Sequence, residues 1–150
     1  MTFTLTISAF TDGGLIPAKF TCEGGNVSPE LSWSDVPANT RSFALIMDDP
    51  DAPVGTYTHW ILFDIPADRS SIGEGESKIG IAGKNDFGRA GYGGPCPPRG
   101  HGPHRYFFTL YALDSTSINL KAGADRRHVE TALRGHVVAQ TQHMGRYERK

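Results

Sequence analysis

The stretch of sequence that decides the fold is "GPCPPRGHGPHRYFFTLYAL", residues 94–113. Its first ten residues are mostly proline and glycine, which exclude a helix and the middle of a sheet. Its last nine residues, "RYFFTLYAL", are largely aromatic and aliphatic and predict a core strand. Because His104 and Tyr106 lie two positions apart where this strand starts, they face the same side of it, and Arg105 faces the other. A stiff polar loop therefore presents a histidine and a tyrosine together.

Further strands are predicted upstream, where short apolar or alternating segments are separated by turns rich in glycine and proline. "SFALIMDD" and "THWILFDI" are nearly continuous apolar runs, which is typical of central strands. The predicted segments are 3–10, 18–23, 31–36, 42–49 and 58–65. Residues 65–98 are predicted to be mostly loop, and so long a connection in a small domain indicates a functional role.

A helical pattern is confined to residues 124–145, "ADRRHVETALRGHVVAQTQHMG". Apolar residues recur there at three- and four-residue spacing, and Asp125 is a suitable N-cap. Gly135 interrupts the pattern, so one or two short helices are expected, with His136 and His143 on the helical surface. Residues 146–150 are expected to add an edge strand. Strands first and helices last favour a mostly β protein, a sandwich with a small helical addition.

The composition is that of one globular domain spanning residues 1–150. The chain is 38% hydrophobic and 21% charged, and its net charge is −1. This balance gives no electrostatic reason to expect a nucleic acid or an anionic membrane as a partner. No apolar run approaches the ~20 residues of a membrane span, and the first residues lack the pattern of a signal peptide. We therefore expect a cytoplasmic protein.

Two cysteines, Cys22 and Cys96, are too few for a disulfide scaffold. We expect free thiols, although a single bridge between them stays open because a sequence does not give distances. Cys96, His101 and His104 are residue types that bind zinc, but their spacing lacks the paired geometry of zinc motifs. The sequence also lacks a G-x-S-x-G elbow and a phosphate- or dinucleotide-binding glycine loop. We expect no metal and no cofactor.

Three segments carry residues suited to binding or chemistry. "DDPDAP" at 48–53 crowds three carboxylates at the end of a predicted strand, with a solvated turn as the alternative. His59, beside Trp60, opens the next strand, where a histidine is either a donor at a pocket or simply buried and hydrogen-bonded. In the proline-rich loop, we expect the amides around Gly100 and Gly102 to form a concavity for an anion. The alternative is a rigid structural turn.

Together these segments resemble the phosphatidylethanolamine-binding protein family, which includes the Raf kinase inhibitor proteins, and in particular its compact bacterial and archaeal branch. The resemblance rests on "FTCEGGNVSPELSW" (20–33), "DDPDAP" (48–53), "HW" (59–60), the stretch at 94–113 and "HMGRYER" (143–149). It implies an antiparallel β-sandwich with Greek-key connections and a small anion pocket at one end. By motif matching, the residues that would line this pocket are Asp49, Asp51, Pro53, His59, Cys96, Pro97, Pro98, His104 and Tyr106.

The resemblance also implies how the pocket would work. Asp49 would orient a histidine or meet an ammonium group, while the oxyanion would lie on the loop amides and the Tyr106 hydroxyl. Pro53 would follow a peptide bond that is cis or trans, and Cys96 would narrow the mouth or be a reactive thiol. The longer C-terminal helix of mammalian relatives is missing, so one wall would be open or come from another subunit.

The function expected first is therefore a binding protein for an anionic small molecule such as phosphate or a phospholipid headgroup. One alternative is a protein-interaction regulator that inhibits a kinase or a serine protease. Another is an acid–base enzyme that uses Asp49, His59 and His104 on a phosphoester. Dimers are common in the compact branch, so a homodimer is a further expectation from the resemblance.

Overall fold

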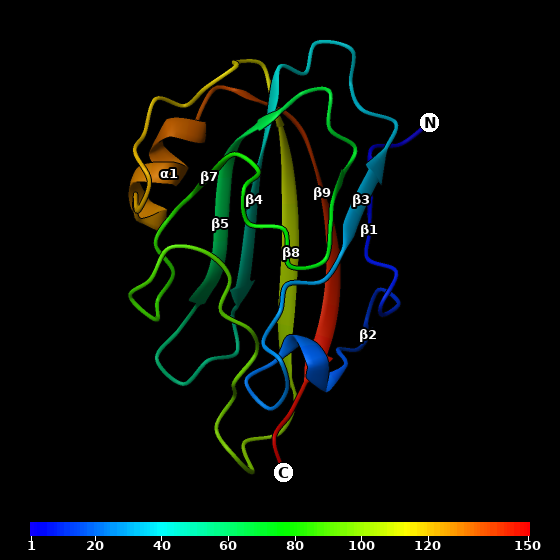
Figure 1. Ribbon diagram of the computed structural model, residues 1–150, viewed down its shortest axis with the longest axis vertical. Helices are drawn as coiled ribbons and strands as arrows, with labels where there is room; N and C mark the ends of the chain where they lie inside the picture. Colours follow the sequence, from blue (N-terminus) through cyan, green and yellow to red (C-terminus); the bar gives the residue numbers. More distant parts are fainter.

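A computed structural model describes all 150 residues, and strands form most of its regular structure (Figure 1). The large sheet has the order β2-β9-β8-β4-β5-β7, and a small sheet has the order β1-β3-β6. Neighbouring strands are antiparallel except for β2 and β9, which run parallel. Crossover connections between non-consecutive strands, such as β4 beside β8, give the sandwich its Greek-key character. The predicted antiparallel sandwich is confirmed.

The strands of the large sheet are β2 (Gly14–Leu15), β4 (Ser42–Asp49), β5 (Tyr57–Pro66), β7 (Ile81–Ala82), β8 (His104–Leu113) and β9 (Val137–Tyr147). Those of the small sheet are β1 (Thr4–Thr6), β3 (Leu31–Ser34) and β6 (Ser71–Ile72). A 3-10 turn, η1 (Ala18–Phe20), and one helix, α1 (Arg126–Leu133), complete the elements. No helix has the length and apolar character that crossing a membrane would require.

The central strands are apolar along their whole length because both of their faces are covered. Phe43, Leu45 and Met47 of β4 point into the main core between the two sheets. The alternate residues Ala44 and Ile46 belong to a second cluster under α1, on the outer face of the large sheet. A strand buried on both faces loses the polar-apolar alternation that marks a half-buried strand.

The last part of the chain folds differently from the expected helices. Asp125 caps α1 by accepting a hydrogen bond from the His128 backbone N–H, as predicted. After Gly135, which has a φ of +81°, the chain forms β9 and pairs with β8 along nearly its whole length. The prediction of a helix over 137–145 was therefore wrong, because pairing with a long core strand outweighs a local helical pattern.

Two smaller expectations are corrected as well. His143 is buried on β9, where its Nε2 lies 2.9 Å from the carbonyl oxygen of Phe10, so it is not a surface residue of a helix. His136 is half-exposed and lies 2.8 Å from Asp114. The expected strand over 18–23 is instead the turn η1, which Pro17 precedes and in which the Thr21 N–H donates to Ala18.

Candidate functional site

A pocket of about 260 Å³ opens at one end of the sandwich, where β4 ends and where β5 and β8 begin. Antiparallel pairing brings these points together, because Asp49 is paired with Tyr57 and Asp48 with Phe107. The pocket is lined by Asp49, Ala52, Pro53, Val54, Tyr57, His59, Phe87, Cys96, Pro97, Pro98, His104 and Tyr106. All but one of the residues expected at the site therefore lie around one hollow.

Asp51 is the expected residue that does not line the pocket. Its carboxylate accepts hydrogen bonds from the Arg105 guanidinium at 2.8 and 2.9 Å and from the Arg105 backbone N–H at 3.0 Å. These hydrogen bonds to Arg105 lower the pKa of Asp51 to about 2. As predicted, Arg105 faces away from His104 and Tyr106, so the ion pair ties the loop after β4 to β8 outside the pocket.

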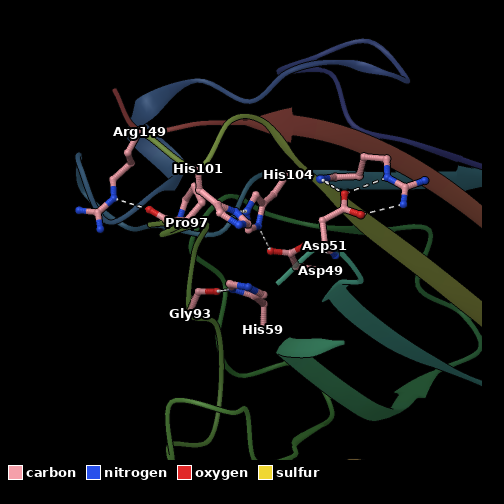
Figure 2. Close-up of polar contacts among 9 residues, drawn as sticks. Asp49, Asp51, His59, Gly93, Pro97, His101, His104 and Arg149 are labelled. Atoms are coloured by element: carbon pink, nitrogen blue, oxygen red, sulfur yellow. Dashed lines mark hydrogen bonds and ion pairs between the residues drawn. The ribbon is translucent and has the colours of Figure 1, made fainter. Parts of the chain in front are cut away.

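Asp49 lies at the inner end of the pocket with only 3% of its surface exposed. One oxygen accepts the backbone N–H of Asp51 at 2.8 Å, and the other lies 2.6 Å from Nδ1 of His104. The opposite nitrogen of His104, Nε2, lies 2.6 Å from Nδ1 of His101 (Figure 2). A carboxylate and two imidazoles thus form one hydrogen-bonded chain, and both ring nitrogens of His104 are engaged within the protein.

His59 contributes a neutral imidazole. Burial lowers its pKa, although the hydrogen bond to the Gly93 carbonyl and the charge of Asp49 oppose this effect. The Nδ1 atom lies 2.7 Å from that carbonyl oxygen, so it carries the proton and donates it (Figure 2). In this tautomer the opposite nitrogen, Nε2, carries the lone pair. It can accept a hydrogen bond from a ligand.

Tyr106 contributes a protonated hydroxyl group. Burial, with the nearby negative charge of Asp49, raises the pKa of the phenol above its ordinary value. The rings of Tyr106 and His59 pack edge to face, with 5.2 Å between their centroids. The hydroxyl can therefore donate a hydrogen bond to an oxyanion at neutral pH.

The loop amides do not form the expected anion concavity. The Gly100 N–H donates to the Arg149 carbonyl oxygen, and the His101 N–H donates to that of Pro98. Neither Gly100 nor Gly102 lines the pocket. Over residues 94–98 the chain holds three prolines, and Gly94 donates to Asn26, so the backbone N–H of Cys96 is the one left without an acceptor.

The cysteines are joined by a disulfide, so the expectation of free thiols was wrong. Their Cα atoms are 5.4 Å apart, and the bridge fastens the pocket wall to the turn after η1. Hydrogen bonds from Cys22 N–H to Pro95 and from the Tyr92 hydroxyl to Phe20 reinforce the same junction. The bridge also removes the free-thiol argument for a cytoplasmic location. The peptide bond before Pro53 is trans, since the chain has no cis peptide bond.

Some residues of the site were not identified from the sequence. Val54, Tyr57 and Phe87 make an apolar rim, and Phe87 lies within the long loop that was expected to be functional. Their role depends on ring contacts, such as the 5.1 Å edge-to-face pair of Tyr57 and Phe87, which a sequence does not reveal. His101 was expected only as a donor near the loop and as a zinc-binding residue type, and no three acidic, histidine or cysteine side chains are arranged to hold a metal ion.

Comparisons with known proteins give a consistent result over nearly the whole chain. A family model described as phosphatidylethanolamine-binding protein matches residues 6–148. A UPF0098 protein of Aquifex aeolicus is 51% identical over 94% of this chain and 85% of its own length. The UPF0098 protein PH1269 of Pyrococcus horikoshii is 50% identical over 95% of this chain and 75% of its own length.

Two solved structures have a similar fold. The chain superposes on a putative phosphatidylethanolamine-binding protein homolog, CT736 of Chlamydia trachomatis, with a TM-score of 0.93 and 38% identity over 99% of each chain. Escherichia coli YbcL, described as a new member of the mammalian PEBP family, gives a TM-score of 0.93 and 34% identity over 100% of each chain.

Proposed function

The chain belongs to the phosphatidylethanolamine-binding protein family, and from this premise we propose that it binds a small phosphorylated molecule in the pocket of about 260 Å³. The observation that carries the proposal is the convergence of four buried polar side chains from three strands. Asp49 ends β4, His59 lies near the start of β5, and His104 and Tyr106 open β8. Asp49 and His104 are hydrogen-bonded to one another and to other groups of the chain, so the cost of burying them is met within the protein, and they stand in fixed positions around the hollow.

The charges around the pocket favour a headgroup that carries both signs. The Tyr106 hydroxyl and the Cys96 N–H are donors for a phosphate oxygen, whereas the Asp49 carboxylate would repel a bare anion. An ammonium group beside Asp49 removes that repulsion, because opposite charges attract strongly where water is excluded. Phosphoethanolamine has both groups, two carbons apart. We infer that it represents the chemistry of the natural ligand.

The apolar rim supports a ligand that continues beyond the headgroup. Val54 is 90% exposed and Phe87 is 38% exposed, and both lie at the pocket. Exposed apolar side chains around a polar hollow are typical of sites that hold an amphipathic molecule. A phospholipid would place its glycerol and first acyl carbons on this rim.

Titration calorimetry with O-phosphoethanolamine and with a short-chain phosphatidylethanolamine tests the proposal. We expect both to bind, the lipid more tightly. Tyr106→Phe should weaken binding about tenfold, since it removes one hydrogen bond to a charged group. The matched control is Tyr111→Phe on the same strand, whose ring packs by the helix cluster and lies outside the pocket. Asp49→Asn should weaken binding of the ammonium-bearing ligands more than that of inorganic phosphate. Unchanged affinity in Tyr106→Phe and Asp49→Asn would overturn the proposal.

A protein target is the second candidate, because the exposed Val54 and Phe87 also offer apolar contacts to a kinase or serine protease. Val54→Ser would then abolish inhibition of the target and leave phosphoethanolamine binding unchanged. An acid–base enzyme is less favoured, since His104 has no free ring nitrogen. A cytoplasmic location and a homodimer stay predictions, which cell fractionation and analytical ultracentrifugation test.

A further inference from the structure

The ring of His104 is held on both sides, and this fixes where its proton lies. The Asp49 carboxylate can only accept a hydrogen bond, so Nδ1 of His104, 2.6 Å away, is the donor. In the neutral ring, Nε2 then carries a lone pair and accepts a hydrogen bond. Its partner at 2.6 Å is Nδ1 of His101, which must therefore carry a proton. Because the Asp49 carboxylate can only accept, it determines which atom donates in both hydrogen bonds of the series Asp49–His104–His101.

The hydrogen-bonded series Asp49–His104–His101 runs from the buried pocket to solvent. Asp49 and His104 are 3% and 2% exposed, whereas His101 is exposed on the loop before β8. The two imidazoles meet edge to face with their centroids 4.8 Å apart, and the backbone N–H of His101 donates to the carbonyl oxygen of Pro98. Because its Nδ1 donates to His104, the neutral ring of His101 has one free lone pair, on Nε2.

We propose that His101 is the positioning residue through which the pocket takes up a proton when it binds an anion. A proton arrives at Nε2 of His101, and the proton on Nδ1 moves along the existing hydrogen bond to Nε2 of His104. His104 then carries two protons and one positive charge beside Asp49, and His101 is neutral again. The net change is one proton gained, and it takes the charge of the Asp49–His104 pair from −1 to zero. This inference rests on the proposed function.

The titratable and charged groups around Asp49, His104 and His101 leave this series as the route for the proton. His59 on β5 is kept neutral by burial, which lowers its pKa. Asp51 and Arg105 neutralise each other in their own ion pair. Two further charged side chains are hydrogen-bonded at this junction, and both are basic, namely Arg99 on the loop and Arg149 after β9. They attract an anion toward the mouth but cannot accept a proton at neutral pH.

The first test needs no ligand. Long-range ¹H–¹⁵N correlation spectra distinguish protonated from unprotonated imidazole nitrogens. At about pH 8 we expect a proton on Nδ1 of both His104 and His101 and bare Nε2 atoms. His101→Asn keeps a donor for His104 and should preserve its tautomer, whereas His101→Phe removes the donor and should shift the Nε2 resonance of His104. A His104 ring that is protonated on Nε2 alone in the wild-type protein would overturn the proposal.

The second test counts protons. The probe is inorganic sulfate, which has no ammonium group and whose charge stays constant between about pH 6 and about pH 8, so any proton uptake belongs to the protein. Calorimetry in two buffers with different heats of ionisation should show uptake of a fraction of a proton by the wild type at about pH 7. The affinity should rise about tenfold from about pH 8 to about pH 6. In His101→Asn both effects should vanish while binding at about pH 8 is retained.

The matched control is His128→Asn. His128 is also an exposed histidine, but it lies on α1, away from the pocket, and its ring is paired with Asp125. This variant should leave proton uptake unchanged. Equal uptake in the wild type and in His101→Asn would overturn the role of His101, although the ligand still binds. If no probe or phosphoethanolamine binds to any variant, the proposed function fails, and the spectra alone decide whether the proton relay exists.

Discussion

The Nε of Arg149 donates a hydrogen bond to the carbonyl oxygen of Pro97 across 2.7 Å, which ties the segment after β9 to the proline-rich wall of the pocket (Figure 2). The same segment accepts the N–H of Gly100 at 2.9 Å and a guanidinium hydrogen bond from Arg99 at 3.2 Å. Residues 148–150 do not line the pocket. They therefore hold the loop from outside the pocket.

Arg149→Ala should weaken ligand binding about fivefold, because about 1 kcal/mol of loop anchoring is lost and the wall must be ordered on binding. The free energy of unfolding should fall by no more than the same amount, about 1 kcal/mol. Arg146→Ala is the control, since the Nε of Arg146 also donates to a backbone carbonyl, that of Gly13, at a site away from the pocket. Calorimetry on both variants decides the matter, and equal affinities would show that the hydrogen bond from Arg149 to Pro97 has no effect on binding.

Folding should become less favourable in mild acid because of His59. Burial lowers the pKa of His59 in the folded protein, so the unfolded chain binds a proton at pH values where the folded protein does not. The stability that the neutral His59 ring contributes to the folded protein is complete above about pH 6.5. It is lost as the pH falls toward the pKa of His59 in the folded protein, by about 1.4 kcal/mol for each unit between the unfolded and folded pKa values. Urea unfolding at several pH values should show this slope, and His59→Gln should flatten it. A slope unchanged in that variant would contradict the assignment.

The central strands of the sandwich could be predicted because the information is local, whereas the pocket and its residues were expected only from the family resemblance. The prediction of β4 at 42–49 was confirmed residue for residue, and that of β8 at 105–113 to within one residue. Both are long apolar runs bounded by proline or polar residues. His104 and Tyr106 share a face because side chains alternate along a strand, so their common orientation required no tertiary information.

The predictions that were wrong concern residues whose partners are distant in the sequence. The residues of β9 have a helical spacing, and they form a strand because they pair with β8 along nearly their whole length and with β2 at their end. The Gly100 amide looked available for an anion, but it is satisfied by Arg149, almost fifty positions later in the chain. Likewise, Cys22 and Cys96 are bridged because η1 lies beside the pocket wall. Such pairings follow from topology, which short-range patterns do not specify.

Gly94 should be intolerant of a side chain, because the pocket wall passes very close to the segment after η1. A Cβ on Gly94 would collide with the carbonyl oxygen of Phe20 and with Oδ1 of Asn26, and it would lie 3.1 Å from Cα of Thr21. Backbone atoms cannot move aside cheaply, so Gly94→Ala should destabilise the fold by about 2 kcal/mol. Gly25→Ala is the matched control, since its nearest neighbour would be the Lys19 carbonyl oxygen at 3.6 Å. Denaturant unfolding that gives equal losses for both variants would contradict this close approach.

The disulfide should stabilise the fold more than it shapes the pocket. It joins cysteines 74 residues apart, and closing so long a loop restricts the unfolded chain, which typically contributes about 2–4 kcal/mol. Cys22 is exposed, so a reductant can reach the bridge. Reduction, or the double change Cys22→Ser and Cys96→Ser, should therefore lower the Tm by roughly 5–15 °C.

Ligand affinity should fall much less after reduction, because other bonds hold the wall where the bridge attaches. The Tyr92 hydroxyl donates to Phe20 at 2.7 Å, and the Gly94 N–H donates to Asn26 at 2.8 Å. We expect phosphoethanolamine to bind the reduced protein within about threefold of the oxidised one, less than the loss of one hydrogen bond would cause. Thermal unfolding and calorimetry on the same reduced sample separate the two effects, with mass spectrometry verifying the thiols. An unchanged Tm, or a loss of all binding at temperatures where the protein stays folded, would contradict the prediction that the disulfide stabilises the fold more than it shapes the pocket.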